Sequence, residues 1–162
     1  MRRRRTVPPI TIPTDSAALG YIAGLVDGEG NINISTAFCV GKSKSLSYHA
    51  RVVITNTNEL LMVWLLESLG GTIENRRHRK PNWKPSWNWA VYGDNAASLL
   101  KAIKPYLVIK KDQATLAMQL RSLQKIRGKK TPDAKAQTVL ANIKADMNRL
   151  NARGVEVIEG HV

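Results

Sequence analysis

Two carboxylates stand between glycines in the segment Asp27-Gly28-Glu29-Gly30. The apolar and small residues before them predict a helix over residues 14–27 that Thr14 or Asp15 caps and that Gly28 and Gly30 end. Both acids therefore lie at the C-terminal end of a helix, where the dipole disfavours each negative charge by about 0.3–1 kcal/mol. Carboxylate and carbonyl oxygens bind Mg²⁺ or Ca²⁺, and a bound cation would reverse that penalty. The segment is a candidate metal site; the alternative is a capping turn that a nearby Lys or Arg stabilises.

Small residues precede the acids at helical spacing, namely Gly20, Ala23 and Gly24. Glycine inside a helix costs about 1 kcal/mol relative to alanine, so its presence indicates that another backbone comes close. That backbone could belong to the same chain or to a second copy. In a two-fold dimer the two Glu29 side chains would meet at the centre and repel each other unless metal ions lay between them. Metal ions beside paired phosphates suit in-line displacement by water. We expect the dimer.

The balance of charge indicates a polyanionic partner. The 162 residues carry a formal net charge of +13, which is more than a solvated surface needs. Nucleic acid is the usual counterpart of such an excess, although charge does not distinguish DNA from RNA. The apolar share of 43% indicates a folded body. No run of about 18 apolar residues predicts a membrane span. Prolines and no apolar segment follow the N-terminal arginines, so we expect an intracellular protein, of cytoplasm or organelle, that is not secreted.

The periodicity of the apolar residues predicts one α+β domain over residues 14–152, with a basic tail at 1–13 and a C-terminal tail at 153–162. Helices are expected over 14–27, 60–69, 94–104, 112–127 and 131–151, and strands over 31–38, 48–54, 72–79 and 87–92. This order predicts a four-stranded antiparallel sheet with helices on one face. The other face is polar or basic, and is either solvated or bound to a partner. Its residues are Asn31, Asn33, Ser35, His49, Arg51, Arg76 and His78.

The segment from Ile22 to Gly30, Ile-Ala-Gly-Leu-Val-Asp-Gly-Glu-Gly, resembles the LAGLIDADG motif of the homing endonucleases. The order of elements over roughly residues 14 to 130 is similar to that family's core. The resemblance implies an αββαββα core with a saddle-like antiparallel sheet and extra C-terminal helices. It also implies a metal-dependent DNA endonuclease encoded within an intron or intein. Family members with one motif are homodimers and those with two are monomers. This chain has one, so the resemblance implies a homodimer that cuts both strands of a long pseudo-palindromic target.

The resemblance assigns roles to single residues. It makes Glu29 the catalytic metal ligand, and makes Gly28 a metal ligand through its backbone carbonyl, whereas Asp27 has a more structural role. The cofactor implied is Mg²⁺, with Mn²⁺ as a substitute and Ca²⁺ binding without supporting cleavage. Lys110, or Lys111 after a one-residue slip, would organise water at the metals. Asn56 would lie near the scissile phosphates. Some members have an arginine where this chain has Leu60, which leaves the outer part of the water network in doubt.

The resemblance places the open sheet face in the major groove of double-stranded DNA. The expected base-reading residues are those of the open face, together with Asn88. Arginine matches guanine and asparagine matches adenine, and we expect Arg76 to contribute most to specificity. Other cations would contact phosphate and hold position without reading sequence. They are Lys42, Lys44, Arg77, Arg79, Lys80 and the N-terminal arginines.

Three other functions compete with cleavage. One is an RNA-binding intron splicing factor (a maturase), which would make intron RNA a further partner. Another is a DNA-binding regulator on the same fold, and the third is a basic protein of the ribosome or chromatin. Loss of the metal carboxylate would mark a non-cutting relative, whereas Glu29 is present with Lys110. An acid exposed between glycines also has no purpose in a structural protein. The sequence does not determine whether the last helix touches DNA or supports the core.

Overall fold

The chain is described by a computed structural model over residues 8–38, 46–76, 84–128 and 132–152. The predicted order of helices and strands is confirmed. The elements are α1 (Ser16–Glu29), β1 (Gly30–Phe38), β2 (Leu46–Asn56), α2 (Glu59–Leu69), β3 (Thr72–Arg76), β4 (Ser86–Tyr92), α3 (Gly93–Ile103), the 3₁₀ turn η1 (Lys104–Tyr106), α4 (Lys111–Arg127) and α5 (Ala134–Leu150).

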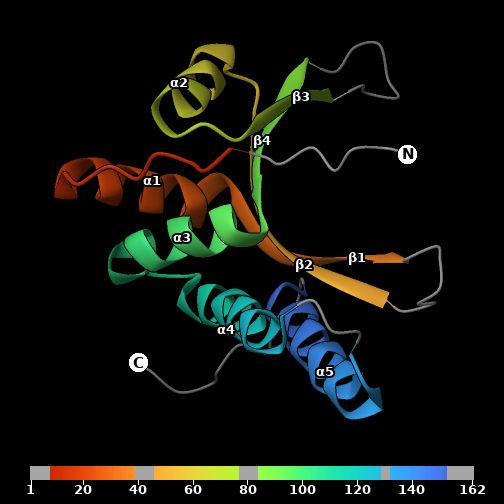
Figure 1. Ribbon diagram of the computed structural model, residues 1–162. Coiled ribbons are helices and arrows are strands. Elements are labelled where there is room, and N and C mark those ends of the chain that lie inside the picture. The colour runs from red at the N-terminus through yellow and green to blue at the C-terminus, as the bar shows by residue number, and fades with distance from the viewer. Residues whose placement is uncertain (1–7, 39–45, 77–83, 129–131, 153–162) are drawn as a thin grey trace, which may run out of the picture.

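The four strands form one antiparallel sheet in the order β1-β2-β4-β3. Figure 1 shows the helices on one side of this sheet, and none of the described helices covers the other side. The predicted α+β class and its helices on one face are therefore confirmed. Among the described residues, no helix is both long enough and apolar enough to cross a membrane.

Alternation of side chains along the strands produces the two faces. Ile32, Ile34, Val52 and Ile54 are completely buried and face the helices. The register continues this apolar layer across the sheet, because Ile54 lies opposite Trp89 of β4. Burial of each such side chain contributes about 1.5–3 kcal/mol, so the alternation fixes which face the helices cover. The residues between them, such as Asn33 and Ser35 of β1, then necessarily point to the open face.

The boundaries differ from the predictions in small but informative ways. Helix α1 continues through Gly28 and ends at Glu29, and the amide of Gly30 closes the last turn by donating to the Val26 carbonyl. Gly28 does not stop the helix, because glycine can adopt the helical conformation as well as others. The strand then begins two residues later, at Gly30. Of the alternative caps, the side chains of Asp15 and Asn58 accept the N-terminal amide bonds of α1 and α2. His78 lies outside the described residues.

Two glycines with positive φ differ in whether a side chain would also meet close neighbouring atoms. Gly71 (φ +90°) begins the turn into β3, and a Cβ there would lie 2.9 Å from the Ala90 carbonyl oxygen. Gly93 (φ +57°) begins α3, and nothing lies within 4 Å of its Cβ position. Both positions are strained for other residues, but only Gly71 is also crowded.

We therefore expect Gly93→Ala to lower the free energy of unfolding by about 1–2 kcal/mol, the cost of the left-handed conformation. Gly71→Ala should lower it clearly further, because β4 must also move. Urea denaturation of the two variants beside the wild type measures the difference. Equal losses would contradict the close packing of Gly71 against β4.

Candidate active site and DNA-binding surface

The carboxylate of Asp27 joins the end of α1 to the turn before α4. It accepts backbone amides from Val108 (2.6 Å), Lys110 (3.0 Å) and Ile109 (3.3 Å). Bonds from amides to a charged acceptor are about twice as strong as neutral ones, and three of them fix the carboxylate firmly. Asp27 is therefore committed to holding two distant segments of the chain together.

Lys110 binds the same junction from the other side. Its Nζ donates to the carbonyl oxygens of Val26 (2.9 Å) and Asp27, which lie in the last turns of α1. Burial lowers the pKa of Lys110, whereas the charge of Asp27 raises it. A cation at a helix C-terminus is favoured by the dipole. The alternative, Lys111, is exposed as the first residue of α4, so Lys110 is the lysine held at the end of α1.

Glu29 is the last residue of α1 and is exposed. Unlike Asp27, it forms no hydrogen bond or ion pair with the described part of the chain. Gly28 is also exposed, and nothing lies within 4 Å of its Cβ position. A free carboxylate beside the open last turn of a helix offers the oxygen ligands that a hard divalent cation binds. Within the described ranges, no group of three or more His, Cys, Asp or Glu side chains could hold a metal.

Asn56 ends β2 at the same end of the sheet as Glu29. The register places Gly30 opposite Ile54, two residues before Asn56. The Asn56 side-chain oxygen accepts the backbone amide of Asn58 (2.8 Å), and the side chain is half-buried. This bond fixes the orientation of the Asn56 amide and leaves its nitrogen available at the end of β2.

The predicted small-residue face needs a correction at one position. Ala23 is completely buried in the protomer's own core, so it does not face a partner. The positions that are open are Gly24 and Gly28, where a Cβ would meet nothing within 4 Å, and Gly20, where it would only touch the ring of Tyr106 at 4.0 Å. Spacing by four residues places Gly20, Gly24 and Gly28 in one row on α1. We call this row the glycine ridge.

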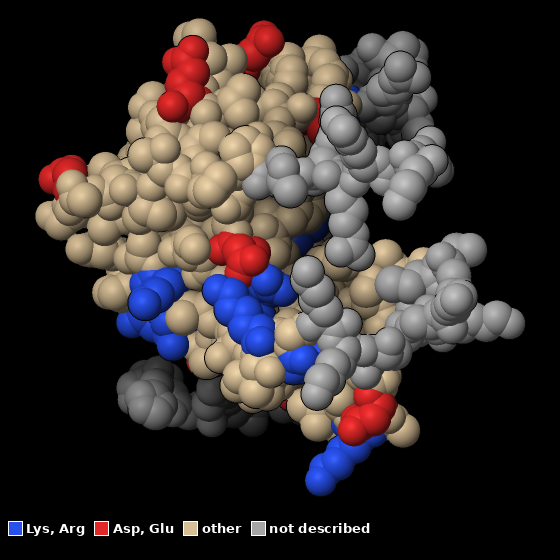
Figure 2. All heavy atoms as spheres, viewed as in Figure 1, with Lys and Arg blue, Asp and Glu red and all other residues tan. Residues whose placement is uncertain are grey.

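Exposed apolar side chains lie next to the glycine ridge. Tyr21 of α1 is 53% exposed and packs edge-to-face against Trp64 of α2, with ring centroids 5.4 Å apart. Leu60, one turn before Trp64, is 80% exposed. Beyond Tyr106, Val108 and Ile109 are 82% and 71% exposed. Figure 2 shows Lys and Arg gathered over the lower part of the face in view and few of them over its upper part. An apolar area of this kind indicates an interaction surface.

The open face of the sheet carries the predicted DNA-binding residues in register. Asn33 lies opposite Arg51 and Ser35 opposite His49. Asn31 shares this face one step closer to α1, where its Oδ1 accepts from Asn33. By the alternation along β3 and β4, Arg76 and Asn88 point to the same side, and Arg76 is exposed.

Contacts on this face orient two of those side chains. The Arg51 guanidinium lies 5.6 Å from the centroid of the Tyr92 ring, a cation–π contact. Asn88 accepts the Thr55 hydroxyl at 2.7 Å. Sequence reasoning missed Tyr92 and Thr55, although extending the alternation from Asn88 and Arg51 would have placed both on this face. Burial, and then the charge of Arg121, lower the pKa of His49, so its ring is neutral at pH 7.

Comparison with known proteins identifies the architecture. No protein-family model matches the sequence, nor does any curated protein. Among solved structures, the homing endonuclease I-CvuI in complex with DNA superposes with a TM-score of 0.68 at 22% identity, covering 87% of this chain and 85% of that chain. The archaeal intron-encoded I-Vdi141I, also complexed with DNA, gives 0.69 at 18% identity, with 85% and 86% covered. The chain has the LAGLIDADG homing endonuclease fold.

A third likeness concerns the size of the LAGLIDADG unit. The LAGLIDADG homing endonuclease I-SmaMI superposes with a TM-score of 0.68 at 16% identity. The match covers 89% of this chain but 48% of I-SmaMI. One LAGLIDADG-fold chain of the present length thus corresponds to about half of I-SmaMI and to most of I-CvuI.

The contrast between the two acids of the LAGLIDADG segment leads to a prediction about stability. Asp27→Asn should lower the free energy of unfolding by about 1–3 kcal/mol, since the amide group cannot accept all three backbone bonds. Glu29→Gln should change it by less than about 0.5 kcal/mol, because the exposed carboxylate has no partner to lose. Denaturant unfolding measured without divalent metal tests both. A large loss in Glu29→Gln would contradict the free state of this carboxylate.

Proposed function

We propose that this protein is a site-specific, divalent-metal-dependent DNA endonuclease that acts as a homodimer and makes a double-strand break in a long pseudo-palindromic target. The observation that carries this proposal is the placement of Glu29. It is an unpaired carboxylate at the end of the uncovered glycine ridge, one turn from the cation of Lys110. Stability of the protomer does not explain such an acid, whereas a shared metal site does.

The glycine ridge favours self-association through α1. Glycines at this spacing let two helices approach closely, and the exposed apolar side chains beside the ridge would be buried at the same time. A two-fold axis at the ridge brings the C-terminal ends of both α1 helices together. The two open sheet faces would then form one continuous surface. The half-length match to I-SmaMI supports two copies of this chain per functional unit.

The residues at the end of α1 fit a divalent cation. Glu29 would supply a carboxylate oxygen and Gly28 a backbone carbonyl, with the remaining ligands coming from the second protomer, phosphate and water. A bound Mg²⁺ supplies activation of water and stabilisation of negative charge at the phosphate. Lys110 holds positive charge beside that position, and Asn56 presents an amide nitrogen toward the same end of the sheet. The structures of I-CvuI with DNA were obtained in the presence of Mg and of Ca, which supports this choice of cofactor.

The open sheet face would bind the major groove of double-stranded DNA. Its polar row matches base edges, and arginine and asparagine are suited to direct readout. Arg51 is held by Tyr92 and Asn88 by Thr55, so two of the readers have fixed positions before DNA arrives. The net charge of +13 supplies the attraction to the backbone.

Glu29→Gln tests catalysis directly. Two kinds of DNA serve as substrates. One is duplexes that the wild-type protein selects from a randomised library, and the other is DNA of an allele that lacks the intron or intein. With Mg²⁺ or Mn²⁺ the wild type should make one double-strand break, and with Ca²⁺ it should bind without cutting. Glu29→Gln should retain affinity and lose cleavage by about a hundredfold or more, because the metal ligand is gone. Gel electrophoresis of cleaved and of bound DNA reads both quantities.

Glu67→Gln is the matched control, since Glu67 is also an exposed glutamate in the last turn of a helix, α2. It should cut like the wild type. If both the wild type and Glu29→Gln bind but neither cuts, the endonuclease proposal fails. The regulator or splicing function is then tested by repeating the binding with DNA and intron RNA.

Gly24→Leu tests the dimer. The protomer has room for the added side chain and the helix gains about 1 kcal/mol from the loss of glycine, so folding should be preserved. The bulky side chain should separate the two helices, giving a monomer that no longer cuts both strands. Sedimentation at a concentration where the wild type is dimeric measures the change, with Ala141→Leu on the exposed side of α5 as control. A monomeric wild type, or a dimeric Gly24→Leu, would refute the interface.

A further inference from the structure

The β1–β2 hairpin extends beyond the rest of the sheet. β4 pairs with β2 only from Arg51 to Asn56, so residues 46–50 of β2 pair with β1 alone. Figure 1 shows this end of the hairpin running past β4 with α5 beneath it. A two-stranded hairpin is marginally stable in water, and its free edges expose unpaired backbone groups. The projecting end therefore needs support from outside the sheet.

Two amide side chains from the C-terminal part of the fold bond to this projecting end, and a third bonds to β1 nearer α1. Gln124 of α4 donates its Nε2 to the carbonyl oxygen of Tyr48 (2.7 Å), and Gln137 of α5 donates to that of Leu46 (3.0 Å). Asn151, the C-cap of α5, donates its Nδ2 to the carbonyl oxygen of Ile32 (2.9 Å). Two anchors hold β2 where β4 does not cover it, and the third holds β1, the outer strand of the sheet.

The two glutamines are held differently. The Oε1 of Gln124 accepts from Arg121 at 2.8 Å, and Arg121 pairs with Asp94 at 2.7 Å, so this carboxamide is fixed by a chain of polar contacts. The Oε1 of Gln137 is buried and has no hydrogen-bond partner in the described part of the chain, where the bond to Leu46 is the one hydrogen bond of this side chain.

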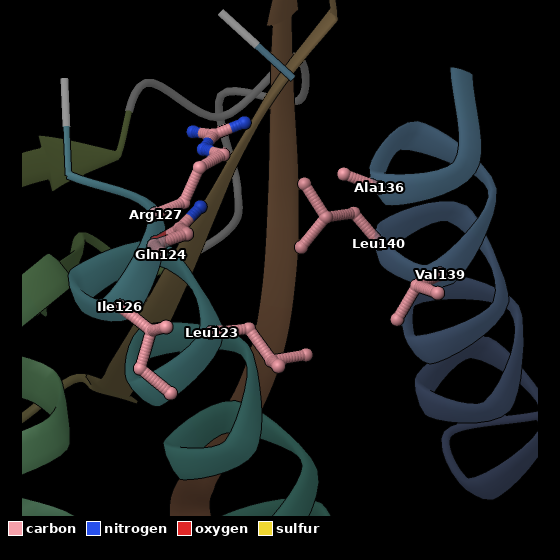
Figure 3. A pocket seen from close by; sticks show the side chains of 7 residues that line it. All are labelled: Leu123, Gln124, Ile126, Arg127, Ala136, Val139 and Leu140. Atoms are coloured by element: carbon pink, nitrogen blue, oxygen red, sulfur yellow. The ribbon is translucent and has the colours of Figure 1, made fainter. Parts of the chain in front are cut away.

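Apolar packing supports the same end, since Tyr48 and Ile34 are buried in the core that includes Leu140 and Ile143 of α5, but it leaves a gap. A cavity of about 160 Å³ lies between α4 and α5, lined by Gln124, Arg127 and apolar side chains. Figure 3 shows Leu123 of α4 and Leu140 of α5 extending toward each other across this gap. Because the two helices are incompletely packed here, the hydrogen bonds to the hairpin backbone carry more of its positioning.

We propose that Gln124 and Gln137 are positioning residues that set DNA specificity at the outer base pairs of each half-site. The proposal rests on the proposed function, because it assumes that the open sheet face reads DNA. From Gly30 to Phe38 the strand spans about 26 Å at 3.3 Å per residue, which corresponds to seven or eight base pairs at about 3.4 Å each. Glu29 precedes the near end of this strand. Ser35 and His49 lie on the far, projecting part, and so face the base pairs farthest from the cut.

Loosening the anchors should act unequally along the hairpin. The near end remains fixed by β4 and by α1, whereas the far end keeps only the packing of Tyr48 and Ile34 against the helices. Base readout by Ser35 and His49 should therefore weaken, while cutting of the central bases by Glu29 should not. A residue that merely stabilised the fold would lower activity on every sequence alike.

Gln137→Met is the variant of choice, because methionine preserves length and apolar packing and removes the donor together with the unpartnered Oε1. Asn142→Met, at an exposed amide of the same helix, is the matched control. In the free protein, hydrogen exchange of the segments 32–38 and 46–50 should be about three- to tenfold faster in Gln137→Met, the equivalent of one lost hydrogen bond, and unchanged in the control. The double variant with Gln124→Met should add to the effect.

Selection from a library randomised across the half-site provides the second measurement. In Gln137→Met the preference at the outer positions should fall by about three- to tenfold, with the inner preferences and the cleavage rate at saturating DNA unchanged. Unchanged hydrogen exchange in the hairpin would overturn the proposal, and so would faster exchange with a uniform loss at all positions. If the wild type binds no duplex selectively, the proposed function fails with it, and hydrogen exchange then still reports whether the anchors hold the hairpin.

Discussion

One junction, between the end of α1 and the start of α4, determines where Glu29 and the glycine ridge lie. Asp27 accepts three amides from residues 108–110, and Lys110 returns two bonds to the carbonyls of α1. These bonds link segments more than 80 residues apart in the sequence. They hold α1 in an orientation that leaves its glycine ridge uncovered. Without these bonds, Asp27 would also be a free carboxylate at the same end of the helix, and it would compete with Glu29 for any cation.

No loop separates α1 from β1, so the position of Glu29 is coupled to the position of the open sheet face. Glu29 is the last helical residue and Gly30 the first of the strand. A Cβ at Gly30 would lie 2.6 Å from the Val26 carbonyl oxygen, so the backbone makes this turn only with glycine. Movement of the sheet would therefore move Glu29 with it. The distance from the acid to each side chain on the open face of β1 is then a property of the strand and not of a flexible connection.

The sequence was sufficient for the parts of this site that depend on local pattern. The flanking glycines, the alternation in β1 and β2 and the order of elements were all visible along the chain. Ala23 was misplaced, because helical spacing groups it with Gly20 and Gly24 while packing turns it inward. The anchors of the hairpin could not be predicted at all. Gln124, Gln137 and Asn151 bond to carbonyls 76 to 119 residues away, and nothing in a glutamine or asparagine signals such a partner.

The distribution of charge explains how a chain of net charge +13 could associate with itself. Two such protomers repel each other, so an interface between them has to avoid basic residues and gain its stability from apolar burial. The glycine ridge and its neighbours, Tyr21, Leu60, Trp64, Val108 and Ile109, meet that condition. Salt would screen the repulsion between protomers and the attraction to a polyanion together. Rising ionic strength should therefore favour the association of protomers while weakening the binding of DNA, which separates the two surfaces on physical grounds alone.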